Sequence, residues 1–143
     1  MPTMPTMPIL SVEQIQSFLL QEFPQNTVTV DSLSKQGAWL RQKIDQSHLR
    51  PGGTVSGPVL MTVADIAMYV ALLAEIGIVP LAVTTSLTIN FLRKPSAQAD
   101  ILAHCHLLKV GKTLAIGEVS LYSEGQTDAV AHVVCTYAIP PKK

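Results

Sequence analysis

One acidic residue, Asp65, lies in the most apolar stretch of the sequence, within VADIAMY. Between Arg50 and Arg93 the only other charged side chain is Glu75. Burying an unpaired carboxylate is costly, and a partly desolvated carboxylate is a stronger base that can activate water or attack a carbonyl carbon. Asp65 is therefore a candidate general base or nucleophile. The alternative is a structural acid satisfied by threonine or backbone donors.

The residues before Asp65 offer a second chemical group, the free N–H groups of a helix start. Ser56-Gly57-Pro58 is typical of a helix N-terminus, with Ser as N-cap and Pro in the first turn. First-turn N–H groups have no intrahelical acceptor and lie at the positive end of the helix dipole, so they can stabilise an oxyanion. Pro58 cannot donate, which leaves Gly57 or Val59 as the donor. The same residues could instead only cap the helix.

The helix itself is predicted to run to Gly77, with Pro80 just beyond. It is apolar on every side, so it is either fully buried or spans a membrane. Asp65 in mid-span and the lack of a basic residue at its C-terminal end argue against the membrane. The strands predicted after it need a surface to pack on, so we expect it to be the core of the domain.

The sequence patterns on either side of this helix predict the rest of an α+β domain. A capping box at Ser11 and Gln14 begins a helix over 11–23. Period-two alternation predicts six strands, over 28–32, 38–44, 83–92, 100–110, 113–122 and 129–139. The strand at 83–92 is expected to be half-buried. A curved six-stranded antiparallel sheet wrapped around the long central helix satisfies this order.

Composition limits the function. The 143 residues are 48% hydrophobic and 14% charged with zero net charge, which indicates one domain over 11–143 with buried subunit interfaces. Residues 1–10 are expected to form a flexible tail. The sequence has no basic cluster of the kind that binds nucleic acid, so nucleic acid is not expected as a partner. Cys105 and Cys135 are typical of buried free thiols in a cytoplasmic protein, and the His-Cys-His run at 104–106 lacks a further ligand, so no metal is expected.

Three segments, RPGGTVSGPVLMTVADIAMY, TTSLTINFLRKP and LLKVGKTLAIGEVSLY, together with the order of elements, resemble the PaaI-like hotdog-fold acyl-CoA thioesterases of the 4-hydroxybenzoyl-CoA thioesterase superfamily. The resemblance covers residues 11–140. It implies a hotdog fold, homodimers joined sheet edge to sheet edge, and often homotetramers. Val63-Ala64-Asp65 matches the family's acidic triplet and Gly57 the first glycine of its glycine pair. Thr84 falls where some relatives place a Ser or Thr that helps position water.

The chain also departs from the family pattern. Arg50 stands where an Asn is expected, Ser56 where a His is expected, and Pro58 where a second Gly is expected. These changes affect how the thioester carbonyl would be polarised. A non-catalytic acyl-CoA or acyl-carrier binding protein is therefore the alternative function. A hydratase is less favoured, because no His lies close to Asp65 in sequence.

Spacing along the helix predicts a shared active site. Gly57 and Asp65 are eight residues apart, which is about 12 Å at 1.5 Å per residue. One thioester carbonyl cannot contact both residues within one subunit. If both act, the active site lies at a dimer interface and a lone subunit is inactive.

The expected activity is hydrolysis of a small or medium acyl or aryl thioester to free acid and CoA, without a cofactor or metal. Three further groups are candidate substrate contacts: Arg50, Ser56 and Val59 around the helix start; Arg93, Lys94, Gly111 and Lys112 for the CoA phosphates; Met61, Met68 and Tyr69 along the acyl group. Solvated turns and ordinary core packing are the alternatives for the last two groups.

Overall fold

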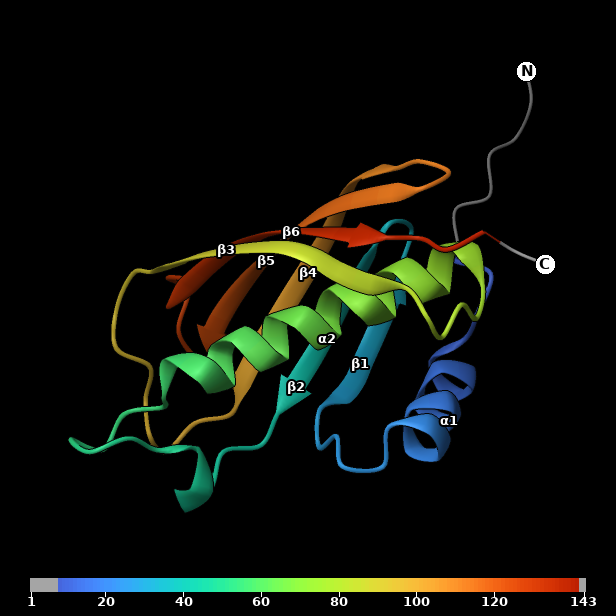
Figure 1. The fold of residues 1–143 in the computed structure, drawn as a ribbon. Helices are drawn as coiled ribbons and strands as arrows, with labels where there is room; N and C mark the ends of the chain where they lie inside the picture. Colours follow the sequence, from blue (N-terminus) through green and yellow to red (C-terminus); the bar gives the residue numbers. More distant parts are fainter. Residues whose placement is uncertain (1–7, 142–143) are drawn as a thin grey trace.

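Residues 8–141 are described by the computed structural model. In chain order the elements are α1 (Val12–Glu22), β1 (Thr29–Ser34), β2 (Gly37–Gln42), a short 3-10 helix η1 (Gln46–His48), α2 (Gly57–Ile76), β3 (Val83–Phe91), β4 (Ile101–Val110), β5 (Leu114–Ser123) and β6 (Ala131–Ala138). The strands form one antiparallel six-stranded sheet in the order β1-β2-β4-β5-β6-β3. Figure 1 shows this sheet wrapped around α2, with α1 beside β1.

The predicted α+β hotdog architecture is confirmed, and the helix caps are those that the sequence indicates. Ser56 accepts the Val59 N–H at the start of α2, and Gly77 ends it with a positive φ of 98°. The Ser11 and Gln14 capping box is present at the start of α1. The 3-10 helix η1 was not expected, because its three residues are too few to give a periodic pattern.

The core is built on α2, whose length and composition would also suit a membrane span. Eleven of its 20 residues are buried, most of them against the sheet. One strip of α2 is not covered by the sheet, and it consists of Pro58, Met61, Thr62, Asp65 and Tyr69. These positions recur at spacings of three and four, so they share one side of the helix. Asp65 therefore lies on the part of α2 that the single chain leaves partly open.

Strand β3 is the outermost strand at one edge of the sheet, and it pairs with β6 alone. The sequence indicated a half-buried strand here, but Val83 and Phe91 are 55% and 54% exposed and only Leu87 and Ile89 are partly buried. Apolar and polar residues do alternate along β3, but no described part of the chain covers the apolar residues at either end of the strand. An exposed apolar edge strand is a ready surface for pairing with another strand.

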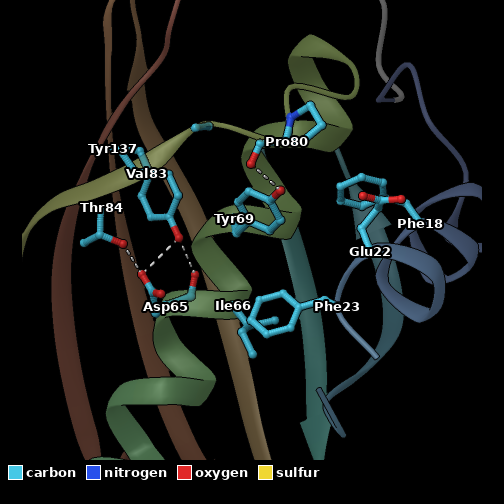
Figure 2. Close-up of a pocket in the computed structure, with 11 residues that line it drawn as sticks. Phe18, Glu22, Phe23, Asp65, Ile66, Tyr69, Pro80, Val83, Thr84 and Tyr137 are labelled. Atoms are coloured by element: carbon cyan, nitrogen blue, oxygen red, sulfur yellow. Dashed lines mark hydrogen bonds between the residues drawn. The ribbon is translucent and has the colours of Figure 1, made fainter. Parts of the chain in front are cut away.

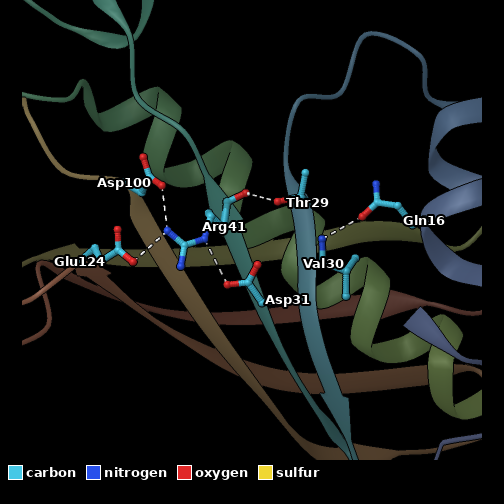
Figure 3. A network of polar contacts seen from close by, with 7 residues as sticks. All are labelled: Gln16, Thr29, Val30, Asp31, Arg41, Asp100 and Glu124. Carbon is cyan, nitrogen blue, oxygen red and sulfur yellow. Dashed lines mark hydrogen bonds and ion pairs between the residues drawn. The ribbon is translucent and has the colours of Figure 1, made fainter. Parts of the chain in front are cut away.

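The opposite edge, strand β1, is hydrogen-bonded to α1 at Val30, although most of its residues are exposed (Figure 3). Its Val30 N–H donates to the side chain of Gln16 on α1 at 3.0 Å. Arg41 on β2 forms ion pairs with Asp31 on β1 at 3.2 Å, with Asp100 at 2.8 Å and with Glu124 at 2.9 Å. Its hydrogen bonds to Asp100 and then Glu124 raise the pKa of Arg41 well above its ordinary value. Arg41 thus fastens β1, β2 and the start of β4 to the turn after β5.

The predicted tail over residues 1–10 falls mostly outside the described residues, which begin at residue 8. Its last residues contact the fold. The Ile9 N–H donates to the Ala74 carbonyl of α2 at 2.9 Å, and Leu10 packs against the core. Contacts with α2 therefore begin before Ser11.

Gly117 on β5 lets α2 approach the sheet closely. A Cβ at this position would lie 2.6 Å from Met68 Sδ and 3.3 Å from the His106 carbonyl oxygen. We expect Gly117→Ala to lower the free energy of unfolding by about 1–3 kcal/mol, because overpacking displaces core side chains. Denaturant unfolding at fixed protein concentration measures this change.

The matched comparison uses Met68→Ala, which empties the space that the new methyl group would enter. Adding Gly117→Ala to Met68→Ala should cost less than adding it to the wild type. An equal cost in both backgrounds would show that Met68 is not the reason for glycine here.

Candidate active site

Asp65 lies beside a cavity of about 390 Å³ between α1, α2 and the start of β3 (Figure 2). The lining residues are mostly aromatic and aliphatic: Phe18, Glu22, Phe23, Asp65, Ile66, Tyr69, Pro80, Ala82, Val83, Thr84 and Tyr137. Asp65 and Thr84 also line a second cavity of about 290 Å³ with Met61, Thr62 and Leu87. The carboxylate thus stands at the boundary of two cavities, one of which is large enough for a small organic group.

Two hydroxyl groups hold the Asp65 carboxylate (Figure 2). Thr84 on β3 donates to Asp65 Oδ1, and the Tyr137 hydroxyl on β6 donates to the same atom at 3.0 Å. The Tyr137 hydroxyl is also 3.2 Å from the Asp65 carbonyl oxygen. Within residues 8–141, no donor is hydrogen-bonded to Oδ2. The arrangement fixes one carboxylate oxygen and leaves the other available to a reacting molecule.

Thr84 was expected to help position water, and its hydrogen bond limits how it can do so. A hydroxyl has one hydrogen, and an ionised carboxylate can only accept. Because Thr84 gives this hydrogen to Asp65, its oxygen can only accept one from a water molecule. Such a water would lie beside Asp65, where the carboxylate can take its second proton.

Tyr137 is a site residue that the sequence did not identify. It pairs across the sheet with Thr84, and its side chain is 3% exposed. Burial raises the pKa of the Tyr137 hydroxyl far above its ordinary value, and the Asp65 charge raises it further. Tyr137 is therefore a neutral donor at any physiological pH. The only signal in the sequence was a tyrosine at an inward-facing position of a strand whose other inward-facing residues are small or aliphatic.

Within the described residues, the Gly57 N–H at the start of α2 has no hydrogen-bond acceptor. The Val59 N–H donates to Ser56 Oγ at 3.4 Å, and the Leu60 N–H donates to the Ser56 carbonyl at 3.3 Å. Pro58 has no N–H, and the first helical residue has no intrahelical acceptor. Of the two donors that the sequence offered, Val59 is used by the cap and Gly57 is left.

Three basic side chains that the sequence predicts as substrate contacts line the same cavity as Gly57. Arg50, Arg93 and Lys94 line a cavity of about 450 Å³ together with Gly57 and Phe91, and no acidic residue lines it. Arg93 also donates to the Ala129 carbonyl. The Phe91 ring lies against Gly57, because a Cβ there would be 3.1 Å from Phe91 Cζ. This cavity combines positive charge, backbone donor and apolar surface.

Other predicted contacts lie elsewhere. Met61 lines the smaller cavity beside Asp65, and Val59 lines a separate cavity with His48. Met68 is fully buried against Gly117, so the structure places it in the core instead of along an acyl group. Gly111 and Lys112 form the turn between β4 and β5 and line neither the Asp65 cavities nor the Gly57 cavity.

Comparison with known proteins identifies the class of this fold and site. The Thioesterase superfamily model matches residues 52–130, which contain α2, β3, β4, β5 and both candidate catalytic groups. A presumed thioesterase from Silicibacter sp. is 40% identical, with a TM-score of 0.87 over 94% of each chain. The chain belongs to the thioesterase superfamily. Hydrolysis of acyl thioesters is the general activity that this membership supports.

More distant solved structures share the fold. Thioesterase superfamily member 2 from Mus musculus is 22% identical, with a TM-score of 0.76 over 90% of this chain and 94% of that one. The PaaI protein of the phenylacetic acid degradation operon of E. coli is 17% identical, with a TM-score of 0.76 over 92% of this chain and 97% of that one. No curated protein sequence matches the chain.

Proposed function

We propose that the protein is an acyl-CoA thioesterase that hydrolyses a small or medium acyl or aryl thioester to the free acid and CoA. The observation that carries this proposal is Asp65, whose Oδ1 is held by Thr84 and Tyr137 while Oδ2 is left for the reaction. A fixed carboxylate beside a mostly apolar cavity suits a base or nucleophile for a thioester carbonyl.

The acyl group would occupy the cavity between α1 and α2. Its volume of about 390 Å³ and its aromatic lining suit a short chain or a single ring. Phe18 lies across it from Asp65, with its ring centroid 6.2 Å from that of Tyr69 (Figure 2). Phe18 on α1 and Phe23 just after it would therefore limit the length of the acyl group.

CoA would lie toward the cavity of Arg50, Arg93 and Lys94. Basic side chains bind phosphate oxygens by charge-assisted hydrogen bonds. The Phe91 ring at the same place offers an apolar contact for the pantetheine arm. In one chain, however, Asp65 and Gly57 line different cavities.

Pairing of two β3 strands would bring these cavities together. The Thr84 end of β3 contacts Asp65, and the Phe91 end of β3 contacts Gly57. In an antiparallel pair related by a two-fold axis, the Thr84 end of one strand lies beside the Phe91 end of the other. Asp65 of one subunit would then face Gly57 of the partner subunit, and each homodimer would contain two active sites.

The reaction then follows from the groups present. The thioester carbonyl oxygen would accept a hydrogen bond from the N–H of the partner's Gly57, which stabilises negative charge as the carbon becomes tetrahedral. Asp65 Oδ2 would either take a proton from the attacking water or attack the carbonyl carbon itself. In the first route the C–S bond breaks and CoA leaves as the thiolate, which then takes up a proton. In the second route, attack by Asp65 breaks the C–S bond and expels CoA as the thiolate, which takes up a proton, and water then hydrolyses the acyl-Asp65 anhydride to the free acid and the Asp65 carboxylate.

The first prediction from this proposed function concerns Asp65. Wild type should hydrolyse some members of a panel of short, medium, long and aromatic acyl-CoAs, and Asp65→Asn should lose at least about 100-fold in kcat, since an amide is neither base nor nucleophile. Free thiol release measures turnover, and size-exclusion chromatography checks that the variant keeps its oligomeric state.

The panel also tests the alternative function. Saturable acyl-CoA binding with no turnover by the wild type would support a non-catalytic binding protein. The replacements Arg50, Ser56 and Pro58 at the helix start would then be the cause of lost activity. Equal turnover by wild type and Asp65→Asn would contradict the assigned role of Asp65.

The second prediction tests the shared site by mixing inactive variants. Gly57→Pro removes the N–H, and the extended backbone of Ser56, with φ −71° and ψ 151°, is compatible with a following proline. Because a Cβ at position 57 would lie 3.1 Å from Phe91 Cζ, Gly57→Ala, which adds this Cβ and keeps the N–H, is the matched control for the contact with Phe91. Gly57→Pro and Asp65→Asn should each be inactive. Unfolding and refolding them together in equal amounts should restore about a quarter of the wild-type sites, because half of the dimers are mixed and each has one intact site.

Each variant refolded alone is the control and should stay inactive. If mixed refolding restores nothing although mixed dimers form, both groups act within one subunit and the interface site is wrong.

The third prediction concerns acyl length. Phe18→Ala should extend the cavity and raise the kcat/KM ratio of a long to a short acyl-CoA by about tenfold or more. Leu20→Ala changes a mostly exposed residue of the same helix that does not line the cavity, and it should leave the ratio unchanged. Unaltered chain-length preference in Phe18→Ala would mean that the acyl group binds elsewhere.

A further inference from the structure

Tyr137 is held more rigidly than the other donor to Asp65. Its backbone is part of β6, which lies between β5 and β3, and its side chain is 3% exposed. Its ring packs beside that of Tyr69, with centroids 6.1 Å apart. Thr84, in contrast, lies on the exposed edge strand. The Tyr137 hydroxyl is therefore the buried and fixed member of the pair.

The position of the Tyr137 hydroxyl also determines which carboxylate oxygen is free. It lies within hydrogen-bond distance of both Asp65 Oδ1 and the Asp65 carbonyl oxygen, so it joins the side chain to the backbone of α2. A half-turn of the carboxylate only exchanges two equivalent oxygens, but movement of the Asp65 side chain to another rotamer would break the hydrogen bond to Oδ1 and leave only the contact with the backbone carbonyl oxygen. Tyr137 thus opposes loss of the present rotamer.

We propose that Tyr137 is a positioning residue for Asp65: its hydroxyl holds Oδ1, directs Oδ2 toward the thioester and stabilises the ionised carboxylate. This inference rests on the proposed thioesterase function. A hydroxyl that donates to a carboxylate favours the charged form.

Within residues 8–141 of one subunit, few other titratable groups face Asp65, and in the proposed dimer the cavity of the partner's Arg50, Arg93 and Lys94 faces it as well. Glu22 from α1 and Tyr69 from α2 line the same cavity, and Cys135 lies nearby on β6, while β3 has no titratable side chain. Burial raises the pKa of Tyr69, and burial raises that of Cys135 to about 12, so neither group ionises where an acid limb is measured. Glu22 is the one other carboxyl group to control, and Glu22→Gln does so.

The test is Tyr137→Phe, which keeps the ring and removes the donor. We expect kcat for the best acyl-CoA to fall about tenfold or more with little change in KM, because one hydrogen bond to a charged group is lost. We also expect the acid limb of the pH profile of kcat/KM to move to higher pH. Tyr122→Phe, on the outer face of β5 where Tyr122 packs against Trp39, is the matched control and should change neither.

A second variant covers the case in which Tyr137→Phe does not fold. Site-specific 3-fluorotyrosine at position 137 keeps the shape of the side chain and makes the hydroxyl a stronger donor. The acid limb should then move to lower pH. Glu22→Gln should leave both shifts in place.

The outcomes separate the inference from the function on which it rests. An active wild type with a folded Tyr137→Phe that has the same kcat and acid limb would overturn the inference alone, as would an unchanged limb with fluorotyrosine. A wild type that hydrolyses none of the panel would overturn both.

Discussion

The fold depends on burying one long apolar helix with a single sheet. Six strands curve around α2 and cover most of it, but one sheet in one chain does not enclose a helix completely. The strip through Met61, Asp65 and Tyr69 stays open where the sheet ends at β3. A carboxylate in the covered part of α2 would be desolvated without a partner. On the strip it is close enough to the edge strand β3 and its neighbour β6 to accept two hydroxyl hydrogen bonds, and it is partly exposed.

The same geometry divides the reactive groups between the two ends of β3. Its start carries Thr84 beside Asp65, and its end carries Phe91 beside Gly57. A strand of nine residues separates groups that a single carbonyl would need together. The helix spacing that first suggested a shared site is therefore repeated in the strand that lies along it.

Much of the fold follows from local sequence signals. Ser56, Pro58 and Gly77 mark the ends of α2, and simple alternation locates every strand to within a few residues, because caps and alternation depend on neighbours in sequence. Pairing is not local. That β3 joins β6, and that Tyr137 reaches Asp65 across 72 positions, depends on how the sheet closes around the helix. Met68 was predicted to lie along the acyl group but lies in the core. The sequence of an apolar helix does not show which of its sides the sheet covers.

The two edges of the sheet differ in a way that limits assembly. The Gln16 side chain on α1 accepts a hydrogen bond from the Val30 N–H on β1, and Arg41 on β2 forms an ion pair with Asp31 on β1. Strand β3 has no such cover within the described chain. A sheet with two open edges can add copies at both sides and grow into a fibre, whereas a sheet with one open edge is completed by a single copy. In the proposed dimer, α1 would hinder a further strand from pairing with β1 at Val30, which would favour growth through β3 into a closed pair.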